Sequence, residues 1–134
     1  MTPQPEPRAT LSRRQRLLKT SDFKAVYGAR ARAGDGHVVV YARPNGLAVT
    51  RLGVSVGRGC GGAVQRNRIK RLLREAFRQA RAAFPAGYDI VVVPLERAYA
   101  FAEVGRSLRA LVPEAIRRCQ AGAGPRGAAD GRAK

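Results

Sequence analysis

The sequence predicts a single α/β domain in which helices pack against a small β-sheet. Its 134 residues match the usual length of one domain, and 45% of them are hydrophobic, which is enough for one core. Apolar residues recur at helical spacing over residues 63–82, whereas short runs rich in β-branched residues occupy 38–41, 51–56 and 88–93. The presence of both periods in one short chain indicates the α/β class.

The first expected helix lies near the N-terminus. Ser21 and Asp22 are favourable residues at the start of a helix, and Gly28 marks its expected end. One face of this segment carries three large side chains, those of Phe23, Val26 and Tyr27. The pattern therefore predicts a short helix with a wide apolar and aromatic stripe.

Two strands are expected next along the chain. Residues 38–41 and 51–56 are rich in β-branched side chains, and they flank the turn signal Arg-Pro-Asn-Gly at 43–46. We interpret them as an antiparallel pair whose register the loop length leaves open.

Residues 63–82 form the most strongly patterned segment, an amphipathic helix. Its apolar positions follow the spacing i, i+3, i+4, i+7, i+8, i+11 and are Ile69, Leu72, Leu73, Ala76, Phe77 and Ala80. After a break at 84–87, the apolar run 88–93 is closed by Pro94, and we interpret it as a buried strand.

A last helix follows this strand. Val104, Leu108 and Leu111 supply its apolar side. Proline lacks a backbone N–H and disfavours a helix interior, so we expect Pro113 to begin a second short helix that carries Ile116.

The two ends of the chain differ in composition from the body. The first eight residues hold three prolines, and the C-terminal stretch is rich in Gly, Ala and Arg without apolar periodicity. We expect a domain over residues 11–119 between disordered tails at 1–10 and 120–134.

Features of the chain favour a cytoplasmic location. The N-terminus lacks the apolar core of a secretory signal, and no apolar run approaches the roughly 18 residues that a membrane-spanning helix needs. Cys60 and Cys119 stand far apart without CxxC spacing, so we expect free thiols in a reducing compartment and no structural zinc site.

The charge balance points to a polyanionic partner. Lys and Arg number 26 against 9 Asp and Glu, which gives a formal net charge of +17. The common counter-charges for so basic a body are nucleic acid phosphates and anionic lipid headgroups. A small acidic substrate rarely requires so much charge, so we expect no small-molecule substrate and, without a membrane segment, no membrane partner.

Positive charge concentrates on the amphipathic helix. Between Gln65 and Arg81 the single acid is Glu75, and the bases are Arg66, Arg68, Lys70, Arg71, Arg74, Arg78 and Arg81. A solvated helix face is the general explanation for such charge, but it normally mixes both signs. Arginine binds phosphate through two N–H groups, so a nearly pure arginine face favours phosphate binding.

A glycine-rich loop precedes this helix and supports the same interpretation. The sequence Gly-Arg-Gly-Cys-Gly-Gly at 57–62 joins a strand to a helix start, where backbone N–H groups can approach a phosphate. It also satisfies G-x-G-x-x-G, a dinucleotide-binding fingerprint. In that fingerprint an acidic residue stands at the end of the next strand, whereas Asp89 stands at its start. The chain is also too short for a second nucleotide-binding half, so dinucleotide binding is disfavoured.

Protein-borne catalysis has little support. The single histidine, His37, stands at an expected strand start and is interpreted as a surface or edge residue. The acids are scattered and form no pair of the kind that metal-assisted phosphodiester cleavage needs, so we assign no catalytic and no metal-binding residue.

The run Arg-Asn-Arg-Ile-Lys-Arg-Leu-Leu-Arg-Glu-Ala-Phe-Arg at 66–78 resembles the signature helix of the protein component of bacterial ribonuclease P. The likeness extends to 51–56, Ala63 and Val64, and to the N-terminal positions Leu18, Lys19, Asp22, Phe23, Val26, Tyr27 and Tyr41. It covers roughly residues 13 to 112. It implies element order αβββαβα, a mostly antiparallel four-stranded sheet and a left-handed βαβ crossover around the signature helix.

The resemblance also implies a function. In that family the RNA subunit cuts precursor tRNA to generate the mature 5′ end with Mg²⁺ bound mainly by the RNA, and the protein binds the RNA subunit and the 5′ leader. Carried over to this chain, the RNA-subunit-binding residues are Arg58, Arg66, Asn67, Arg68, Lys70, Arg71, Arg74 and Arg78. One departure is Gly59, where the family usually has a second basic residue.

The leader-binding residues implied by the resemblance are Phe23, Tyr27, Tyr41 and Arg51. Bases stack on aromatic side chains with little sequence preference. Composition alone favours a core role for the rings. The alternative function is that of a ribosomal-type structural RNA-binding protein without a processing role.

Overall fold

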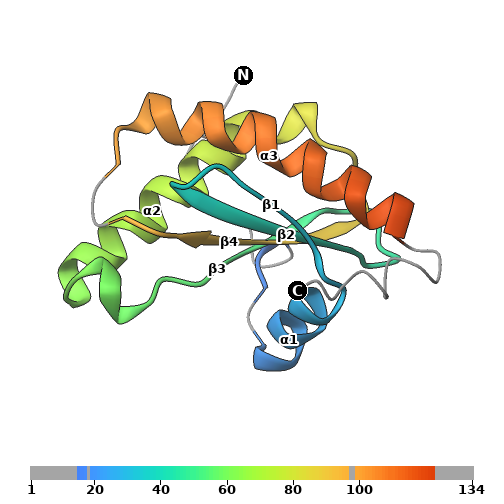
Figure 1. Cartoon of the computed structure of the whole chain (residues 1–134), viewed down its shortest axis with the longest axis horizontal. Helices are drawn as coiled ribbons and strands as arrows, with labels where there is room; N and C mark the ends of the chain where they lie inside the picture. The colour runs from blue at the N-terminus through green and yellow to red at the C-terminus, as the bar shows by residue number, and fades with distance from the viewer. Residues whose placement is uncertain (1–14, 18, 97–98, 123–134) are drawn as a thin grey trace, which may run out of the picture.

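A computed structural model describes residues 15–17, 19–96 and 99–122 (Figure 1). The described helices and strands follow the order α1 (Thr20–Gly28), β1 (Ala31–Gly34), β2 (Val38–Pro44), β3 (Arg51–Val54), α2 (Ala63–Ala80), β4 (Tyr88–Pro94) and α3 (Phe101–Gly122). Two 3₁₀ turns, Arg58–Cys60 and Arg81–Ala83, flank α2. The expected order αβββαβα is therefore confirmed.

The four strands form one sheet in the order β1-β2-β4-β3. Strand β2 pairs antiparallel with both β1 and β4, and β3 pairs parallel with β4. The predicted antiparallel pairing of 38–41 with 51–56 is therefore wrong, because β4 lies between those strands. Its apolar run Ile90, Val91 and Val92 is buried on both sheet faces, and a strand of that kind stabilises the fold most at the centre of the sheet.

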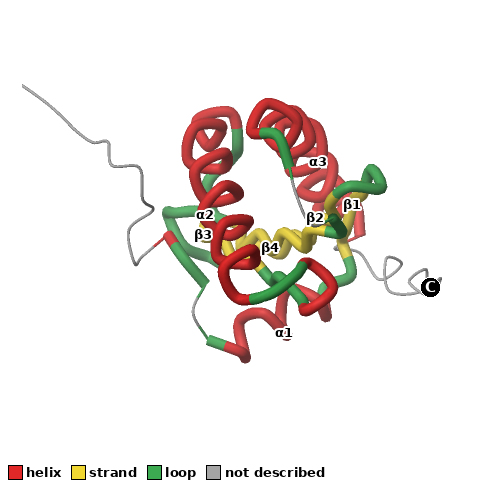
Figure 2. The backbone as a smooth tube through the Cα atoms, turned by 90° about the vertical axis from the view of Figure 1, so that its left-hand side faces the viewer, coloured by secondary structure: helices red, strands yellow, loops and turns green. Residues whose placement is uncertain are grey.

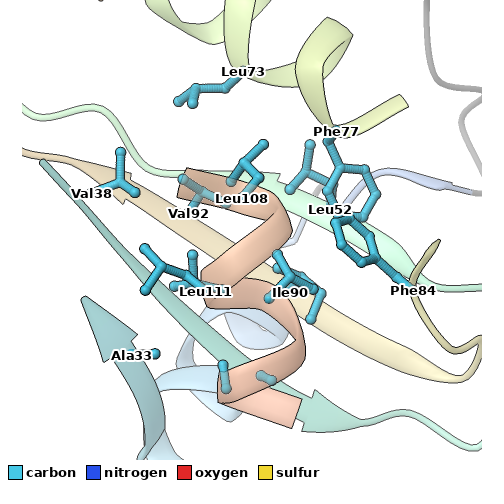
Figure 3. Packing of buried hydrophobic residues seen from close by; sticks show 14 of the residues in the cluster. Ala33, Val38, Leu52, Leu73, Phe77, Phe84, Ile90, Val92, Leu108 and Leu111 are labelled. Atoms are coloured by element: carbon cyan, nitrogen blue, oxygen red, sulfur yellow. The ribbon is translucent and has the colours of Figure 1, made fainter. Parts of the chain in front are cut away.

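The sheet separates the helices into two layers. Helices α2 and α3 cover one face, and α1 lies against the other (Figure 2). The larger core lies on the α2 and α3 side, where Leu73 and Phe77 of α2 and Leu108 of α3 meet the strand residues Val38 and Ile90 (Figure 3). The smaller core under α1 is formed by Leu17, Val26 and Val91.

Helix α3 continues through Pro113, so the predicted break at that residue is wrong. Proline removes one backbone hydrogen bond from a helix interior. On either side of it, Val112, Ala115 and Ile116 are at most 2% exposed in the larger core. Tertiary packing of this apolar face therefore outweighs the local preference of proline.

The predicted helix ends agree with the structure, whereas Ser21 and Asp22 lie inside α1, whose N-cap is Lys19 without a side-chain hydrogen bond. The first helix ends at Gly28, and the amphipathic helix ends at Ala80 with residues 81–83 in a 3₁₀ turn. Cys60 and Cys119 are buried free thiols. None of the described helices is long and apolar enough to cross a membrane. The predicted tails fall mostly outside the described residues.

Candidate nucleic-acid interface

Helix α2 has the orientation that its sequence predicts. Ile69, Leu73 and Phe77 are buried against the sheet and α3, together with Ala76 and Ala80. Leu72, the remaining apolar position, is partly buried and packs against the same core. Burial of this face fixes the opposite face of the helix towards solvent.

The predicted RNA-binding side chains of α2 fall into two groups by exposure. Asn67, Arg68 and Arg71 are exposed, and a second group is partly buried, Arg66, Lys70, Arg74 and Arg78. None of them is enclosed in the core. Arg58 lies in the 3₁₀ turn just before α2, and its side chain falls outside the described part. The helix thus presents basic side chains on its exposed face and along one flank.

Glu75 balances one of these charges. The Nε and Nη2 atoms of Arg78 donate to its two carboxylate oxygens at 3.0 and 2.8 Å, and Gln79 donates to it at 2.7 Å. The hydrogen bonds from Arg78 lower the pKa of Glu75 below its ordinary value. Within the described residues, Arg66, Arg68, Lys70, Arg71 and Arg74 form no ion pair with an acid. Their charge remains available to an external anion.

The loop before α2 supplies no capping side chain at the N-cap position of the helix. The N-cap is Gly62, which supplies no side-chain hydrogen bond, and the first turn contains no acid. Gly61 has a φ of +112°, and the side chain of Gln65 packs over the position that a Cβ would occupy. Val64 in the first turn is 72% exposed. Backbone N–H groups that lack a capping side chain are suited to an anion.

The aromatic residues lie on the opposite face of the sheet, around the smaller core. Phe23, Tyr27 and Tyr41 are partly buried against Leu17, Val26 and Val91. The rings of Tyr27 and Tyr41 meet edge to face, with 4.9 Å between centroids and 88° between planes. The rings therefore pack on the core and keep part of their surface in solvent. We call Phe23, Tyr27 and Tyr41 the aromatic patch.

Arg51 is held by a buried carboxylate beside this patch. Its Nε and Nη2 atoms donate to Asp89 at 2.8 and 2.7 Å, and Asn45 adds a third hydrogen bond at 2.8 Å. Asp89 is fully buried, and its hydrogen bond with Arg51 raises the pKa of the guanidinium. The charge of Arg51 is thus balanced inside the protein, whereas the family resemblance implies only a leader contact for this residue. In the sequence, the feature that could have indicated this ion pair is Asp89 at the start of an apolar strand, where a buried carboxylate needs a partner.

Arg16 is a basic residue near α2 that the sequence analysis missed. It forms an isolated parallel bridge with Leu52 of β3, and its charge, after burial, contributes to lowering the pKa of Arg74. Its place next to α2 depends on sheet pairing between distant segments, which no local sequence pattern reveals. His37, by contrast, is exposed as predicted and contacts Glu96.

An open basic helix face on one side of the sheet and a partly exposed aromatic patch on the other define a nucleic-acid-binding protein of the α/β class. The family model described as Ribonuclease P matches residues 11–115. The chain therefore belongs to the ribonuclease P protein family, and its role is that of the protein subunit of this endoribonuclease, whose RNA is its partner. The resemblance seen in the signature helix is thereby confirmed.

Individual relatives support this membership. The chain is 45% identical over 78 residues to the ribonuclease P protein component of Caldanaerobacter subterraneus, covering 58% of this chain and 67% of that protein. It is 38% identical to the Thermotoga petrophila protein, covering 66% and 75%. Among solved structures, the Thermotoga maritima protein aligns with a TM-score of 0.64 at 34% identity over 69% of this chain and 90% of that one. The Staphylococcus aureus protein aligns with a TM-score of 0.63 at 31% identity, covering 70% and 88%.

Proposed function

We propose that the chain assists the catalytic RNA of ribonuclease P in removing the 5′ leader from precursor tRNA. In this proposal α2 binds the RNA subunit, and the aromatic patch binds the single-stranded leader. The observation that carries it is the basic face of α2, which holds five bases without an acidic partner among the described residues. Such a face favours binding of closely spaced phosphates.

The RNA, and not the protein, performs the cleavage in this proposal. The family resemblance implies Mg²⁺ bound mainly by the RNA, and the described part of the chain gathers no group of three His, Cys, Asp or Glu side chains. Bound Mg²⁺ would supply the activated water and stabilise the leaving oxygen. The contribution of α2 is to lower phosphate repulsion where the RNAs meet.

The leader contact rests on the partly exposed rings of the aromatic patch. Unpaired bases stack on aromatic side chains, and each such contact contributes about 1–3 kcal/mol. Because stacking tolerates any base, this surface suits leaders of different sequence. A cytoplasmic location belongs to the same proposal, since buried free thiols suit a reducing compartment.

The test reconstitutes the full chain with a bacterial ribonuclease P RNA at low Mg²⁺. We expect the chain to stimulate cleavage of precursor tRNA, and to do so more for a precursor with a leader of several nucleotides than for one with a single nucleotide. Stimulation that is absent or independent of leader length would favour the alternative of a structural RNA-binding protein.

Paired variants separate the two surfaces. Arg68→Gln should weaken assembly with the RNA, because the exposed guanidinium has no acidic partner in the described chain. Tyr27→Leu should weaken binding of the leader, whereas Tyr27→Phe keeps the ring and should retain it. If both Tyr27 variants bound the leader equally well, stacking on this ring would be excluded.

A further inference from the structure

The segment around Arg16 extends the sheet beyond β3. Arg16 forms a parallel bridge with Leu52, and the backbone N–H of Leu17 donates to the carbonyl oxygen of Leu52 at 2.9 Å. Leu17 is 5% exposed and belongs to the smaller core under α1. The pairing with Leu52 and the burial of Leu17 therefore hold the backbone at Arg16 in place.

This pairing directs the Arg16 side chain towards α2. Successive residues of an extended chain point to opposite faces, so Arg16 points away from the α1 side that Leu17 faces. Leu52, its bridge partner, is buried in the larger core with Leu73 and Phe77 of α2. Arg16 thus reaches the flank of α2 where Arg74 lies partly buried.

The guanidinium groups of Arg16 and Arg74 lie near each other without an acidic partner in the described chain. Burial, and after it the charge of Arg16, lower the pKa of Arg74 below its ordinary value, although arginine stays protonated. Neither arginine forms an ion pair with an acid of the described chain. Like charges in a partly desolvated place repel one another, and an anion between them would convert repulsion into attraction.

An unsatisfied donor marks the same place. The Nε atom of Arg16 is buried and has no hydrogen-bond partner within the described residues. A buried donor without an acceptor destabilises a protein by about 1–3 kcal/mol, so native structures rarely leave one unpaired. An anionic acceptor at this place would satisfy the donor and would also suit two guanidinium groups.

We propose that Arg16 and Arg74 form a two-arginine site that binds one phosphate of ribonuclease P RNA. Guanidinium groups match the oxygens of a phosphodiester, and the site adjoins the basic surface of α2. The proposal rests on the function proposed above, and it adds the segment that pairs with β3 to the surface that the RNA contacts. It makes the edge of the sheet, and not α2 alone, part of that surface.

The experiment measures the affinity of the full chain for ribonuclease P RNA over a series of salt concentrations. Arg16→Gln and Arg74→Gln should each weaken binding about tenfold and lower the magnitude of the slope of log K against log salt by about 1. The double variant should be only slightly weaker than either single variant, because both remove the same phosphate contact. Arg109→Gln, an exposed position on α3, is the matched control and should bind as the unchanged chain does.

A second measurement separates binding from folding. Without RNA, the melting temperature of Arg16→Gln should stay equal or rise, because the change removes one of two like charges. The proposal would be overturned if Arg16→Gln lowered the melting temperature while Arg74→Gln left the salt slope of RNA binding unchanged. Arg16 would then stabilise the fold without binding a phosphate. Arg16→Lys should recover part of the affinity, as its point charge still attracts phosphate.

The outcomes also separate this proposal from the proposed function. If Arg16→Gln binds as the unchanged chain does while Arg68→Gln binds more weakly, the two-arginine site is wrong and the proposed function stands. If the unchanged chain itself does not bind ribonuclease P RNA, the proposed function fails.

Discussion

Arginines of this chain differ in role because their partners differ. Arg51 donates two hydrogen bonds to the buried carboxylate of Asp89, whereas Arg68 and Arg71 are exposed without an acidic partner in the described structure. The first kind stabilises the sheet, because its charge is balanced. The second kind carries uncompensated charge and suits an external phosphate. The amino-acid composition does not distinguish paired arginines from exposed ones. Their structural or binding roles follow only from the contacts that each side chain makes.

We predict that Asp89→Asn strongly destabilises the protein. Removing one partner of a buried ion pair leaves the other without compensation, at a cost of about 3–5 kcal/mol. The measurement is the free energy of unfolding in urea. Glu114→Gln is the matched control, because Glu114 pairs with the largely exposed Arg117 and Arg118, and exposed pairs contribute at most about 1 kcal/mol. Equal losses in the two variants would contradict the structural role of Asp89.

His37 gives a prediction of pH dependence. Its Nδ1 atom lies 2.9 Å from Oε2 of Glu96, and this hydrogen bond, followed by the charge of Glu96, raises the pKa of His37 above its ordinary value of 6.5. The pair therefore stabilises the fold fully below that value, and the contribution disappears as pH rises through the raised pKa. Because His37 is the only histidine, a proton NMR titration reports it directly. We expect Glu96→Gln to move the midpoint down; an unchanged midpoint would show that the contact does not persist in solution.

At the scale of elements, local patterns predicted helices better than sheet order. The extent of α2 follows from a period of 3.6 and the end of α1 from Gly28, which are properties of neighbouring residues. The order of strands depends on contacts between distant segments, so the turn signal at 43–46 led to the wrong pairing. Strand β1, Ala-Arg-Ala-Gly, has no β-branched residue, and it forms where Ala31 and Ala33 pack in the larger core. Only the family resemblance had implied it.

The same division holds for the candidate site. The basic face of α2 was predictable, because the periodicity of its apolar residues also fixes the opposite face. Arg16 was not predictable, because its place depends on a bridge to Leu52, thirty-six positions away by numbering (52 − 16). The partner of Arg51 was hidden for the same reason, since Asp89 reaches it only through the pairing of β3 with β4.

The docking of α1 on the sheet requires a glycine in β3. A Cβ built at Gly53 would lie 2.7 Å from two ring carbons of Phe23 and 3.1 Å from Cβ of Leu17. We predict that Gly53→Ala destabilises the protein by about 1–3 kcal/mol, the usual cost of overpacking. It should also weaken leader binding, because Phe23 must shift. The measurements are the free energy of unfolding and the affinity for the leader.

Two further variants control this prediction. Gly59→Ala introduces the same methyl group where no heavy atom lies within 4 Å, and it should change little. Phe23→Leu combined with Gly53→Ala should recover part of the lost stability, because the smaller side chain relieves the contact. If Gly59→Ala destabilises the protein as much as Gly53→Ala does, the close approach of Phe23 is not the cause.

At the scale of the whole molecule, the sheet separates two surfaces of different chemistry. Helix α2 lies on one side of the sheet and α1 on the other (Figure 2). The basic face therefore belongs to the α2 side, and the aromatic patch belongs to the α1 side. The segment at Arg16 and Leu17 runs along the edge between them, with Leu17 in the smaller core and Arg16 near α2. In the proposed function, the folded RNA contacts α2 by charge and the single strand stacks on the aromatic patch, so neither contact would displace the other.

The net charge of +17 predicts that the affinity for RNA depends strongly on salt concentration. If α2 and its flank neutralise about six to ten phosphates, the affinity for ribonuclease P RNA should fall by roughly 10³ to 10⁵ between 50 and 200 mM salt. Arg68→Gln combined with Arg71→Gln should lower the magnitude of the slope by about 2, whereas Tyr27→Leu should leave it unchanged, because stacking releases no counterions. Filter binding over a salt series measures both effects. A slope that is flat in the unchanged chain, or that the double variant and Tyr27→Leu lower equally, would show that the charge of α2 does not bind the RNA through its phosphates.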